Sequence, residues 1–532
     1  MNKTPDDNPS DDGNDRANED LTDPRVARRK KLNQIIEMGI DPYGSRFDDR
    51  LFISDCQSRA GEVKFVTAEG SEMELPDFED ESLDYRGWKN ENGPGEEVGP
   101  TVRVAGRIRL ARSAGKLFFL NIRDWTGNIQ IFIGKKQVGE QDFELAKLFD
   151  LGDLIGVQGR LGRTNTGELT VFAEKLFLLT KMLEPAPEKH AGMTDPDLRQ
   201  RMRYADLAFN DGVIDTFMNR TKIIKAIRQT LDGDHFCEVE GPTLHTVAGG
   251  AAARPFLTHH NALDMKLFMR IALELHLKRL MVGGMERVYE LGRVYRNEGL
   301  SPRHNPEFTM LEAYQAYGDY ESMMDLTERL IASAIEATGG GFKREFDGKM
   351  VDFSLPFARE TYANLFTKAT GIDPADEKAV LELAKKLRIK TDDKHLDVVR
   401  NEIFEEKVED TLEGPIFVID YPASICPLTK RKKDNPEIAE RFELFVLGME
   451  VANAYTELND PDLQQALFET QLEGQDEEDS MAKMDHDFVR ALRYAMPPAG
   501  GLGIGIDRLV MLLTGQRSIR DVILFPVLRP ES

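Results

Sequence analysis

The stretch RNEGLSPRHNPEFTMLEAY, from Arg296 to Tyr314, places charged side chains on a predicted β-hairpin. GRVYRNEG reads as one strand, LSPRHN as a loop, and EFTMLEAY as a second strand. Residues two apart on a strand share a face, so one surface would carry Arg296, Glu298, Phe308, Glu312 and Tyr314. Unpaired charges are costly in a protein core. The surface therefore predicts a site for a ligand with anionic, aromatic and cationic parts.

The residue types of this surface match the parts of such a ligand. Arginine binds phosphate and carboxylate groups, so the guanidinium on the first strand would hold the anionic part. Phe308 would stack on a flat ring, and Glu312 with Tyr314 would hold an ammonium group. At the tip of the hairpin, Arg303 and His304 would reach distal phosphates. The alternative is an ion-paired sheet edge without a ligand.

A glycine-rich segment near the C-terminus favours the ligand. PPAGGLGIGIDRLVMLLTG reads as a strand followed by a helix that begins near Asp507. Its glycines permit close approach of a ligand to the backbone, and Arg508 is free to lie over an aromatic ring or a phosphate. The segment is not a P-loop, because no Lys-Ser/Thr pair follows the glycines, and the strand–helix–strand context of a dinucleotide fold is missing.

A third segment supplies carboxylates. RFELFVLGMEVANAYTELND contains Glu443, Glu450 and Glu457, and on its second strand Asn453, Tyr455 and Glu457 alternate on one face. Glu443 and Glu450 are seven residues apart, so the sequence leaves their convergence open. Carboxylates that do converge near phosphates typically hold Mg2+.

Ahead of these segments, residues 100–182 have a sequence pattern that is typical of a small β-barrel. Five short segments alternate apolar and polar residues, with a helix-like DFELAKLFDLG between the third and the fourth. This pattern predicts an OB-type barrel, a fold that often binds single-stranded nucleic acid on stacked aromatic rings. Phe119 and Gln130 are placed like a stacking and base-reading pair. The alternative is that both belong to an ordinary barrel surface.

The remainder of the chain predicts a second, larger domain. After a Pro-rich linker near residue 185 comes a helical stretch, Val213 to Leu231, followed by strands and helices without a repeat or steady βαβ alternation. That mixture favours an antiparallel sheet flanked by helices, so the fold class is α+β. The polar, Gly- and Asp-rich stretch at 50–99 is expected to be a long loop or insertion.

Composition narrows the partners and the compartment. A net charge of −24 disfavours broad electrostatic binding to nucleic acid, and DNA is not expected as a partner. The segment RVARRKKLNQ is nevertheless basic, as a local contact patch or as a solvated helix face. The chain has no apolar run long enough to predict a membrane span, and its first residues lack the apolar stretch of a secretory signal. Cys56, Cys237 and Cys426 are too few and too scattered for a disulfide framework or a zinc site, which indicates a cytoplasmic protein.

Together these segments resemble a known enzyme family. RNEG with RHNPEFT, the GIGIDR ending and the FCEVEGP start look like motifs 2, 3 and 1 of the class II aminoacyl-tRNA synthetases. GGAAARPFLTHHNALDMKLFMR, LEAYQAYGDY and VANAYTELND are most similar to the lysyl-tRNA synthetases of that class. The resemblance covers about residues 100 to 530. It implies a lysine–tRNA ligase, which activates L-lysine with ATP to lysyl-adenylate and then transfers lysine to the 3' end of tRNA(Lys).

The resemblance implies a role for each matching residue. The catalytic residues would be Arg296, on the α-phosphate and the lysine carboxylate, and Arg508. ATP would be bound by Arg296, Glu298, Arg303, His304, Asn305, Phe308 and Arg508, with Phe308 under the adenine and Arg508 above it. Lysine would be bound by Gly249, Gly250, Ala251, Glu274, Arg296, Glu312, Tyr314, Asn453, Tyr455 and Glu457. Mg2+ would be held by Glu443 and Glu450, and the anticodon by Phe119 and Gln130.

The resemblance also implies cofactors, partners and domains. The cofactor is Mg2+, up to three ions per subunit with ATP bound, and the partners are ATP, L-lysine, tRNA(Lys) and a second copy in a homodimer. No membrane contact is expected. The expected domains are a disordered acidic tail (1–24), a basic helix and acidic insertion (25–99), an OB-fold anticodon-binding domain (100–182), a linker (183–210) and a class II catalytic domain (211–532).

Two features depart from the family pattern. His276, in ELHLKR, stands where a tyrosine is common, so a polar contact at the pocket edge is expected to differ. The stretch at 50–99 is longer and more acidic than the family leads us to expect. A second acidic segment near 472–487 is most simply a solvated insertion.

Three other functions are alternatives to the lysine enzyme. An aspartyl or asparaginyl synthetase would need a cation for the substrate side chain, whereas this pocket concentrates glutamate. A synthetase-derived RNA-binding protein without charging activity would not need arginines, carboxylates and the stacking phenylalanine together. A relative that lysylates a protein would resemble the catalytic domain alone, so the barrel and the basic helix favour tRNA.

Overall fold

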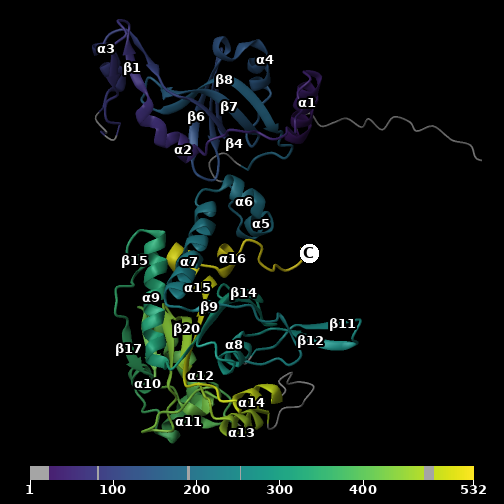
Figure 1. Cartoon of the computed structure of the whole chain (residues 1–532), viewed down its shortest axis with the longest axis vertical. Coiled ribbons are helices and arrows are strands. Elements are labelled where there is room, and N and C mark those ends of the chain that lie inside the picture. Colours follow the sequence, from purple (N-terminus) through teal and green to yellow (C-terminus); the bar gives the residue numbers. More distant parts are fainter. Residues whose placement is uncertain are drawn as a thin grey trace, which may run out of the picture. The chain divides into compact units, whose positions relative to one another are not determined.

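The computed structural model describes residues 23–78, 80, 83–187, 192–251, 253–392, 394–472 and 484–531. Nearly all of the expected acidic tail and most of the acidic segment near 472–487 lie outside these ranges. The chain divides into two units, Met1–Pro196 with Tyr204–Asp211 and Asp197–Arg203 with Gly212–Ser532, and each is described by itself (Figure 1). The stretch expected as a linker contains two short helices, α5 (Pro196–Arg201) and α6 (Arg203–Phe209).

Unit 1 contains the closed barrel that the alternation predicted. Its strands follow the order β4-β5-β6-β8-β7, with β6 and β8 parallel. Val102, Val104 and Ile108 point into the barrel core and are at most 2% exposed. The elements of unit 1 before α5 are α1 (Pro24–Glu37), α2 (Ile53–Ser58), η1 (Arg59–Glu62), β1 (Lys64–Thr67), β2 (Glu72–Glu74), α3 (Tyr85–Glu91), β3 (Gly95–Val98), β4 (Thr101–Ala114), β5 (Leu117–Arg123), β6 (Asn128–Gly134), α4 (Lys135–Lys147), β7 (Leu154–Arg163) and β8 (Leu169–Thr180).

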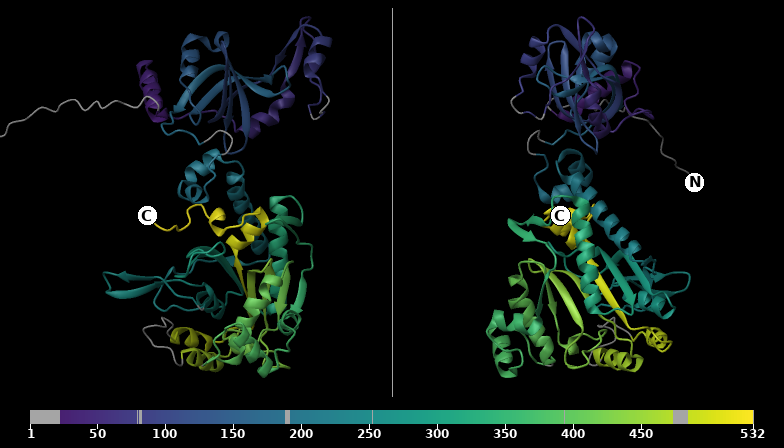
Figure 2. Two further views of the ribbon diagram at one scale, coloured as in Figure 1. Left: turned by 180° about the vertical axis from the view of Figure 1, so that it is seen from behind. Right: turned by 60° about the vertical axis from the view of Figure 1, so that its left-hand side comes forward.

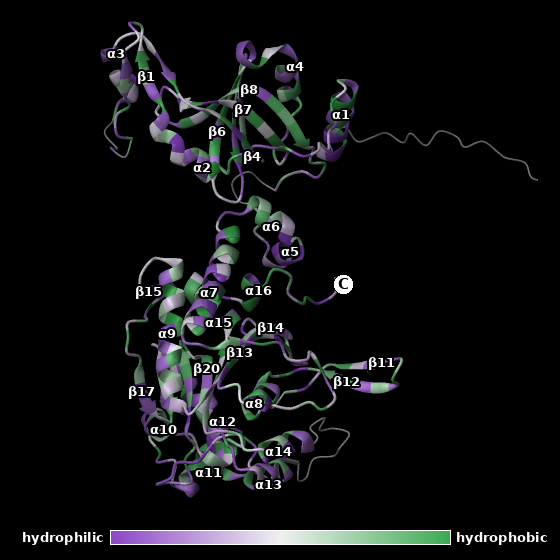
Figure 3. Cartoon of the chain, viewed as in Figure 1, coloured by the Kyte–Doolittle hydropathy of each residue, from purple (hydrophilic) through white to green (hydrophobic). Residues whose placement is uncertain are grey.

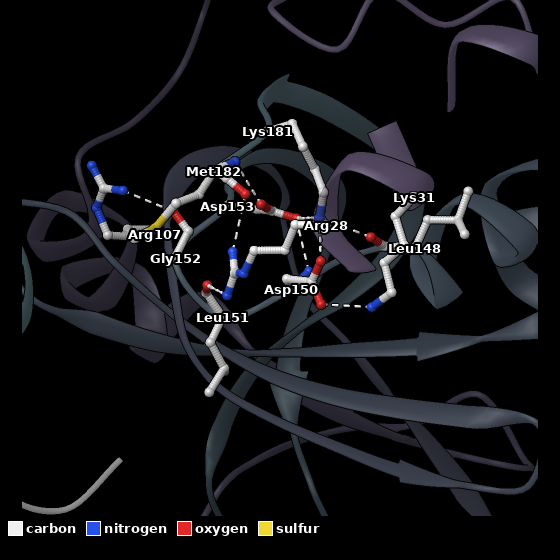
Figure 4. A network of polar contacts seen from close by, with 10 residues as sticks. All are labelled: Arg28, Lys31, Arg107, Leu148, Asp150, Leu151, Gly152, Asp153, Lys181 and Met182. Atoms are coloured by element: carbon white, nitrogen blue, oxygen red, sulfur yellow. Dashed lines mark hydrogen bonds and ion pairs between the residues drawn. The ribbon is translucent and has the colours of Figure 1, made fainter. Parts of the chain in front are cut away.

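Helix α1 is held against the barrel by two of its own basic residues (Figure 4). The Arg28 guanidinium donates to the carbonyl oxygens of Leu151, at 2.9 Å, and Met182, at 3.0 Å. The Lys31 ammonium lies 2.6 Å from a carboxylate oxygen of Asp150. Part of the predicted basic patch therefore serves packing within unit 1 and is not a solvated face.

Beside this contact, Lys181 is enclosed by two carboxylates (Figure 4). Its side chain is 0% exposed, and its Nζ lies 2.6 Å from Asp150 Oδ2 and 2.8 Å from Asp153 Oδ2. A buried ammonium is tolerated only with such partners, because leaving water is costly for a charge. The pair of aspartates supplies them.

The stretch at 50–99, expected as a loop, is folded. β2, β1 and β3 form a three-stranded antiparallel sheet, with α2 before it and α3 between β2 and β3. Its aromatic residues pack on one another, with the rings of Tyr85 and Trp88 stacked at 5.7 Å and that of Phe65 at 5.5 Å from Trp88. The aromatic residues are spread thinly through a polar sequence, which is why the periodicity did not reveal this small core.

Unit 2 is built on an eight-stranded sheet in the order β17-β18-β19-β20-β21-β14-β13-β9, antiparallel except at its two edges. This is the predicted α+β architecture. Its strands are β9 (Cys237–Glu238), β13 (Arg287–Tyr295), β14 (Glu307–Ala316), β17 (Ala358–Thr361), β18 (Ile416–Ile419), β19 (Arg441–Val446), β20 (Met449–Thr456) and β21 (Ala499–Gly505). The two smaller sheets use β10 (Leu244–His245), β11 (Leu257–His260), β12 (Met265–Met269), β15 (Lys343–Phe346) and β16 (Lys349–Asp352).

Three helices cover one face of the large sheet and leave the other for a ligand. α7, α9 and α15 share one apolar core with strand residues such as Leu311, Ala454 and Leu502. These helices carry hydrophilic as well as hydrophobic residues, as a helix with one buried face requires (Figure 3). The helices after α6 are α7 (Val213–Gly233), α8 (Glu274–Val282), α9 (Tyr320–Thr338), α10 (Tyr362–Thr370), α11 (Glu377–Lys386), α12 (Leu396–Lys407), α13 (Pro461–Leu472), α14 (His486–Leu492), α15 (Ile506–Thr514) and α16 (Ile519–Val522), with η2 (Glu409–Thr411) and η3 (Ala423–Ile425).

Asp507 joins three of these elements. The residue is 1% exposed at the start of α15. Its carboxylate accepts from Arg220 of α7 at 2.5 Å and from the backbone N–H of Thr309 on β14 at 2.6 Å. The predicted strand-then-helix arrangement of the glycine-rich segment is thus present, with its first helical turn fixed to the sheet.

A hairpin of β11 and β12 extends away from the rest of unit 2 in every view (Figures 1 and 2). It lies between the two stretches that the family resemblance assigns to motifs 1 and 2. Across the described ranges, none of the helices has the length and hydrophobicity needed to cross a bilayer.

Candidate active site

The open face of the large sheet lines a cavity of about 460 Å3. Strand alternation creates it: Leu311 and Ala313 of β14 point to the helices, so Glu312 and Tyr314 point to the cavity. β20 and β21 pair with each other, and β21 pairs with β14, which brings their residues to the same face. A cavity of this size suits a small ligand held by a few convergent polar groups.

The cavity gathers nearly all of the residues predicted for ATP, lysine and metal. Gly249 is the exception, since only its two successors reach the cavity wall. The predicted residues that line it are Gly250, Ala251, Glu274, Arg296, Glu298, Arg303, His304, Asn305, Phe308, Glu312, Tyr314, Glu443, Glu450, Asn453, Tyr455, Glu457 and Arg508. Their convergence is a property of the fold, whereas their individual roles stay predictions.

Arg296 lies just after β13 and not within it, which corrects the expected strand. The ladder ends at Tyr295, and the Arg296 N–H donates to Pro306 O at 2.8 Å as the hairpin loop opens. The guanidinium lies 5.2 Å from the centre of the Phe308 ring and donates to Ile271 O. Burial lowers the pKa of Arg296, while Glu450 opposes that shift. A partly desolvated cation beside an aromatic ring is suited to a nucleotide phosphate.

Further cations surround the same end of the cavity. Arg508 donates to the carbonyl oxygen of Glu450 at 2.7 Å, and its other terminal nitrogen lies 3.0 Å from His304 Nε2. Arg303 donates to Gly448 O at 2.9 Å. Asn305 is 5% exposed, and its Oδ1 has no hydrogen-bond partner among the described residues. The cations form a region for an anionic ligand. The Asn305 Oδ1 beside them is an acceptor that still lacks a donor.

The opposite end of the cavity is acidic. Glu312 is 3% exposed and accepts from the Leu273 N–H at 2.9 Å and from the Tyr314 hydroxyl at 3.0 Å. Burial, followed by the charge of Glu274, raises the pKa of Glu312 to about 7. The Tyr455 hydroxyl donates to Glu274 at 2.8 Å. A cationic ligand would therefore be favoured here, because it would compensate buried carboxylates.

The acidic end contains a cation that we did not predict. Lys278 is 0% exposed, its Nζ lies 2.5 Å from Glu274 Oε1, and it also forms an ion pair with Glu457. Glu457 is itself 0% exposed, and its Oε1 has no hydrogen-bond partner among the described residues. The i,i+4 spacing of Glu274 and Lys278 in ELHLK was a signal for the first contact, but only tertiary structure shows the second.

Two carboxylates face the cationic end of the cavity, where the arginines lie. Glu443 accepts from the Tyr421 hydroxyl at 2.8 Å and is paired with Arg441, and Arg508 lies 3.4 Å from Glu450 Oε2. Burial raises the pKa of Glu443, Arg441 lowers it, and Glu450 raises it again. No cluster of three or more metal-ligating side chains occurs in the described part of the chain. Two carboxylates nevertheless fit Mg2+, which takes its other ligands from phosphates and water.

Comparison with known proteins agrees with this geometry. Residues 195–529 match the family described as tRNA synthetases class II (D, K and N), and residues 102–179 match the OB-fold nucleic acid binding domain. The lysine–tRNA ligases of Staphylococcus haemolyticus (strain JCSC1435) and Staphylococcus aureus (strain Mu3 / ATCC 700698) are each 47% identical over 518 residues, which span 96% of this chain and 99% of theirs. The chain belongs to the class II lysyl-tRNA synthetase family.

The OB-fold of this lysyl-tRNA synthetase carries an aromatic row on its outer face. Phe119 of β5 lies 5.3 Å from Phe132 of β6, which lies 5.3 Å from Phe172 of β8. Only Phe119 was predicted, because the register that aligns the three rings requires the closed barrel. Gln130 is 5% exposed and donates to Thr170 Oγ1 at 3.0 Å, so its amide nitrogen already has a partner.

His276, the departure from the synthetase pattern, lies away from the cavity lining. The centre of its ring lies 4.6 Å from that of the His245 ring, and the two ring planes are tilted by 43°. Burial, followed by the charge of His245, lowers the pKa of His276 to about 4, so the ring is neutral at pH 7. We expected His276 to change a polar contact at the pocket edge. Its contact is instead with the His245 ring, outside the residues that line the cavity.

Proposed function

We propose that the cavity of unit 2 carries out both steps of lysine–tRNA ligation, with its acidic end holding lysine and its cationic end holding ATP. The activity is that of the family: the chain is a lysine–tRNA ligase. The observation that supports the division of roles is the separation of charge within one cavity, with buried glutamates on one side and arginines on the other.

At the cationic end, Arg296 binds the α-phosphate and the lysine carboxylate. Phe308 stacks on adenine and Arg508 covers its other side, while Glu298 accepts from the adenine amino group. The remaining contacts to the triphosphate and the adenosine come from Arg303, His304 and Asn305. The unpartnered Oδ1 of Asn305 supports a ligand at this position, since buried acceptors without a partner are rare.

At the acidic end, the ε-ammonium of lysine contacts Glu312 and Glu457. Glu274 and the Tyr314 hydroxyl complete its surroundings, and the unpartnered Oε1 of Glu457 supports a donor there. Asn453 and Tyr455 line the stem of the substrate, and Gly250 with Ala251 form the floor. Gly249 has no contact role in this proposal, since it is not among the residues that line the cavity.

Chemistry begins with the lysine carboxylate, which is ionised near pH 7 and needs no general base. One of its oxygens forms a bond to the α-phosphorus while the bond to the bridging oxygen of pyrophosphate breaks. The terminal ribose hydroxyl of tRNA then attacks the carbonyl carbon, AMP leaves, and the hydroxyl proton is released. Arg296 and Arg508 contribute by positioning the reactants and by stabilising charge that develops on the phosphates.

Mg2+ would be held by Glu443 and Glu450, up to three ions per subunit with ATP present. When bound, it would neutralise charge on the phosphate oxygens. Glu450 raises the pKa of the neighbouring Glu443, and this repulsion between the two carboxylates supports a divalent cation at the pair.

The proposal extends to partners and compartment. tRNA(Lys) binds through its anticodon at Phe119 and Gln130 of the barrel, with the aromatic row supporting base stacking. The similarity of the α7–β9 stretch to motif 1 supports a homodimer. Cys56, Cys237 and Cys426 are free thiols, which supports the cytoplasm as compartment.

ATP–pyrophosphate exchange against each of the twenty amino acids tests the proposal directly. Exchange that depends on lysine is expected, and exchange with aspartate or asparagine instead would overturn it. Exchange with no amino acid would show that the cavity lacks the activation step.

Glu312→Gln is expected to raise the KM for lysine by about 100-fold while the KM for ATP changes less than about threefold. The substitution keeps the shape and one acceptor for the Leu273 N–H, but it removes the charge that faces the substrate ammonium. Steady-state exchange with varied lysine and varied ATP measures both constants. An equal rise in the two would contradict the assigned role.

Phe119→Ala is expected to lower kcat/KM for charging of tRNA(Lys) by about tenfold or more, because a base loses its stacking partner. Lysine-dependent exchange, which uses no tRNA, should keep its rate. Trp125→Ala is a matched control, since that aromatic residue is 55% exposed on the same unit but is not part of the aromatic row. Loss of exchange in Phe119→Ala would mean that the ring serves the fold.

A further inference from the structure

Lys278 has an unusual position for a lysine. It lies on α8 behind the cavity wall, 0% exposed, with its Nζ 5.5 Å from the ring centre of Tyr455 and 5.9 Å from that of Phe488. Its ammonium contacts one oxygen of Glu274 and one of Glu457, and both glutamates also line the cavity. The lysine therefore touches the binding carboxylates from the side that the substrate cannot reach.

The acidic end needs such a cation. Glu274, Glu312 and Glu457 are each at most 4% exposed, and three buried carboxylates repel one another strongly. Without a neighbouring cation they would take up protons or turn away from each other. A protonated or displaced glutamate could no longer accept two hydrogen bonds from an incoming ammonium group.

Lys278 contacts one oxygen atom of each glutamate. Glu457 Oε2 forms the ion pair with Lys278, and neither oxygen of Glu457 accepts a hydrogen bond among the described residues. On Glu274, Oε1 receives both Lys278 and the Tyr455 hydroxyl, at 2.5 and 2.8 Å. On each carboxylate the contact with Lys278 thus goes to a single oxygen atom.

We propose that Lys278 is a specificity-determining positioning residue for lysine activation: its ammonium holds Glu274 and Glu457 in place as acceptors for the ε-ammonium of the substrate. It does not touch the substrate itself. This inference deepens the proposed function and rests on it, because it assumes that the acidic end receives lysine. It names a residue outside the cavity wall as part of amino-acid selection.

Lys278→Met, in the full-length chain, tests the proposal by removing the charge while keeping an unbranched side chain. We expect the KM for lysine in ATP–pyrophosphate exchange to rise by about 100-fold and the KM for ATP to stay within about threefold. The preference for lysine over 2-aminohexanoate, which lacks the terminal amine, should fall by about tenfold or more. This ratio is independent of the amount of folded protein, so a merely destabilised variant would not change it.

Lys181→Met is the matched control. Lys181 is an equally buried lysine between two carboxylates, in the barrel of unit 1 (Figure 4). Its replacement should lower the melting temperature without changing the KM for lysine or the preference over 2-aminohexanoate. Lys278→Gln, which keeps a hydrogen-bond donor but no charge, should fall between Lys278→Met and the unsubstituted chain.

Several outcomes would overturn the inference. Equal changes in the KM values for lysine and ATP, or an unchanged preference for lysine, would reduce Lys278 to a residue of the fold. Insolubility of both Lys278 variants would likewise assign the residue to the fold alone. Failure of the proposed function is distinguishable, because the unsubstituted chain would then show no lysine-dependent exchange at all.

Discussion

Arg296→Ala is expected to lower kcat for lysine-dependent ATP–pyrophosphate exchange by about a thousandfold. The guanidinium lies beside Phe308 at the cationic end of the cavity and is the cation that we assign to the α-phosphate. Charge accumulates on that phosphate as the carboxylate attacks, so the loss should affect kcat more than the KM for ATP. Rapid-quench and steady-state exchange measurements distinguish the two.

Arg293→Ala provides the comparison. Arg293 lies three residues earlier on β13, outside the cavity lining, with its side chain 39% exposed near Glu307. Its loss should change kcat less than about threefold, because an exposed ion pair contributes little. Similar losses in both variants would show that the hairpin as a whole, and not the charge at position 296, sustains activity.

Gly501→Ala is expected to reduce kcat/KM for lysine by about a thousandfold. A Cβ at this position would lie 1.8 Å from Glu457 Oε1 and 2.6 Å from the Tyr314 ring. Both side chains are buried, so neither can move aside without leaving the acidic end. A displaced glutamate loses the oxygen that we assign to the substrate ammonium.

Gly503→Ala, two residues further along the same strand, should lower kcat/KM for lysine by less than about tenfold. Its Cβ would lie 3.3 Å from the terminal methyl group of Met310, which adapts readily, and at an ordinary contact distance of 3.7 Å from the Asn453 carbonyl oxygen. We would measure kcat/KM for lysine and for ATP in both variants. The comparison separates a clash at position 501 from a strand that accepts no added methyl group. Equal loss in the two would refute the assignment of Gly501 to the lysine end.

The cavity was predictable where local periodicity decides the geometry. Residues two apart on β14 had to share a face, so Phe308 and Glu312 came together without knowledge of the tertiary fold. The barrel followed from five alternating segments in the same way. The convergence of Glu443 and Glu450, which the sequence left open, depends on the pairing of β19 with β20 and its bulge after Leu444.

What the sequence could not show depends on contacts between distant residues. Lys278 and Glu457 are far apart in the chain, and no pattern in either segment indicates that they meet. The small sheet within 50–99 is held by a few aromatic rings in a polar stretch, which hides its periodicity. Gly249 misses the cavity by one residue, a shift that only the backbone path determines.

The carboxylate of Asp507 has a consequence for how the enzyme is made. It accepts hydrogen bonds from a helix residue 287 positions earlier and from a strand residue 198 positions earlier. The next residue, Arg508, is the one that we propose to cover the nucleotide. A growing polypeptide on the ribosome therefore cannot assemble its ATP site until Asp507 and Arg508 have been synthesised. Incomplete chains would neither consume ATP nor release an unprotected adenylate into the cell.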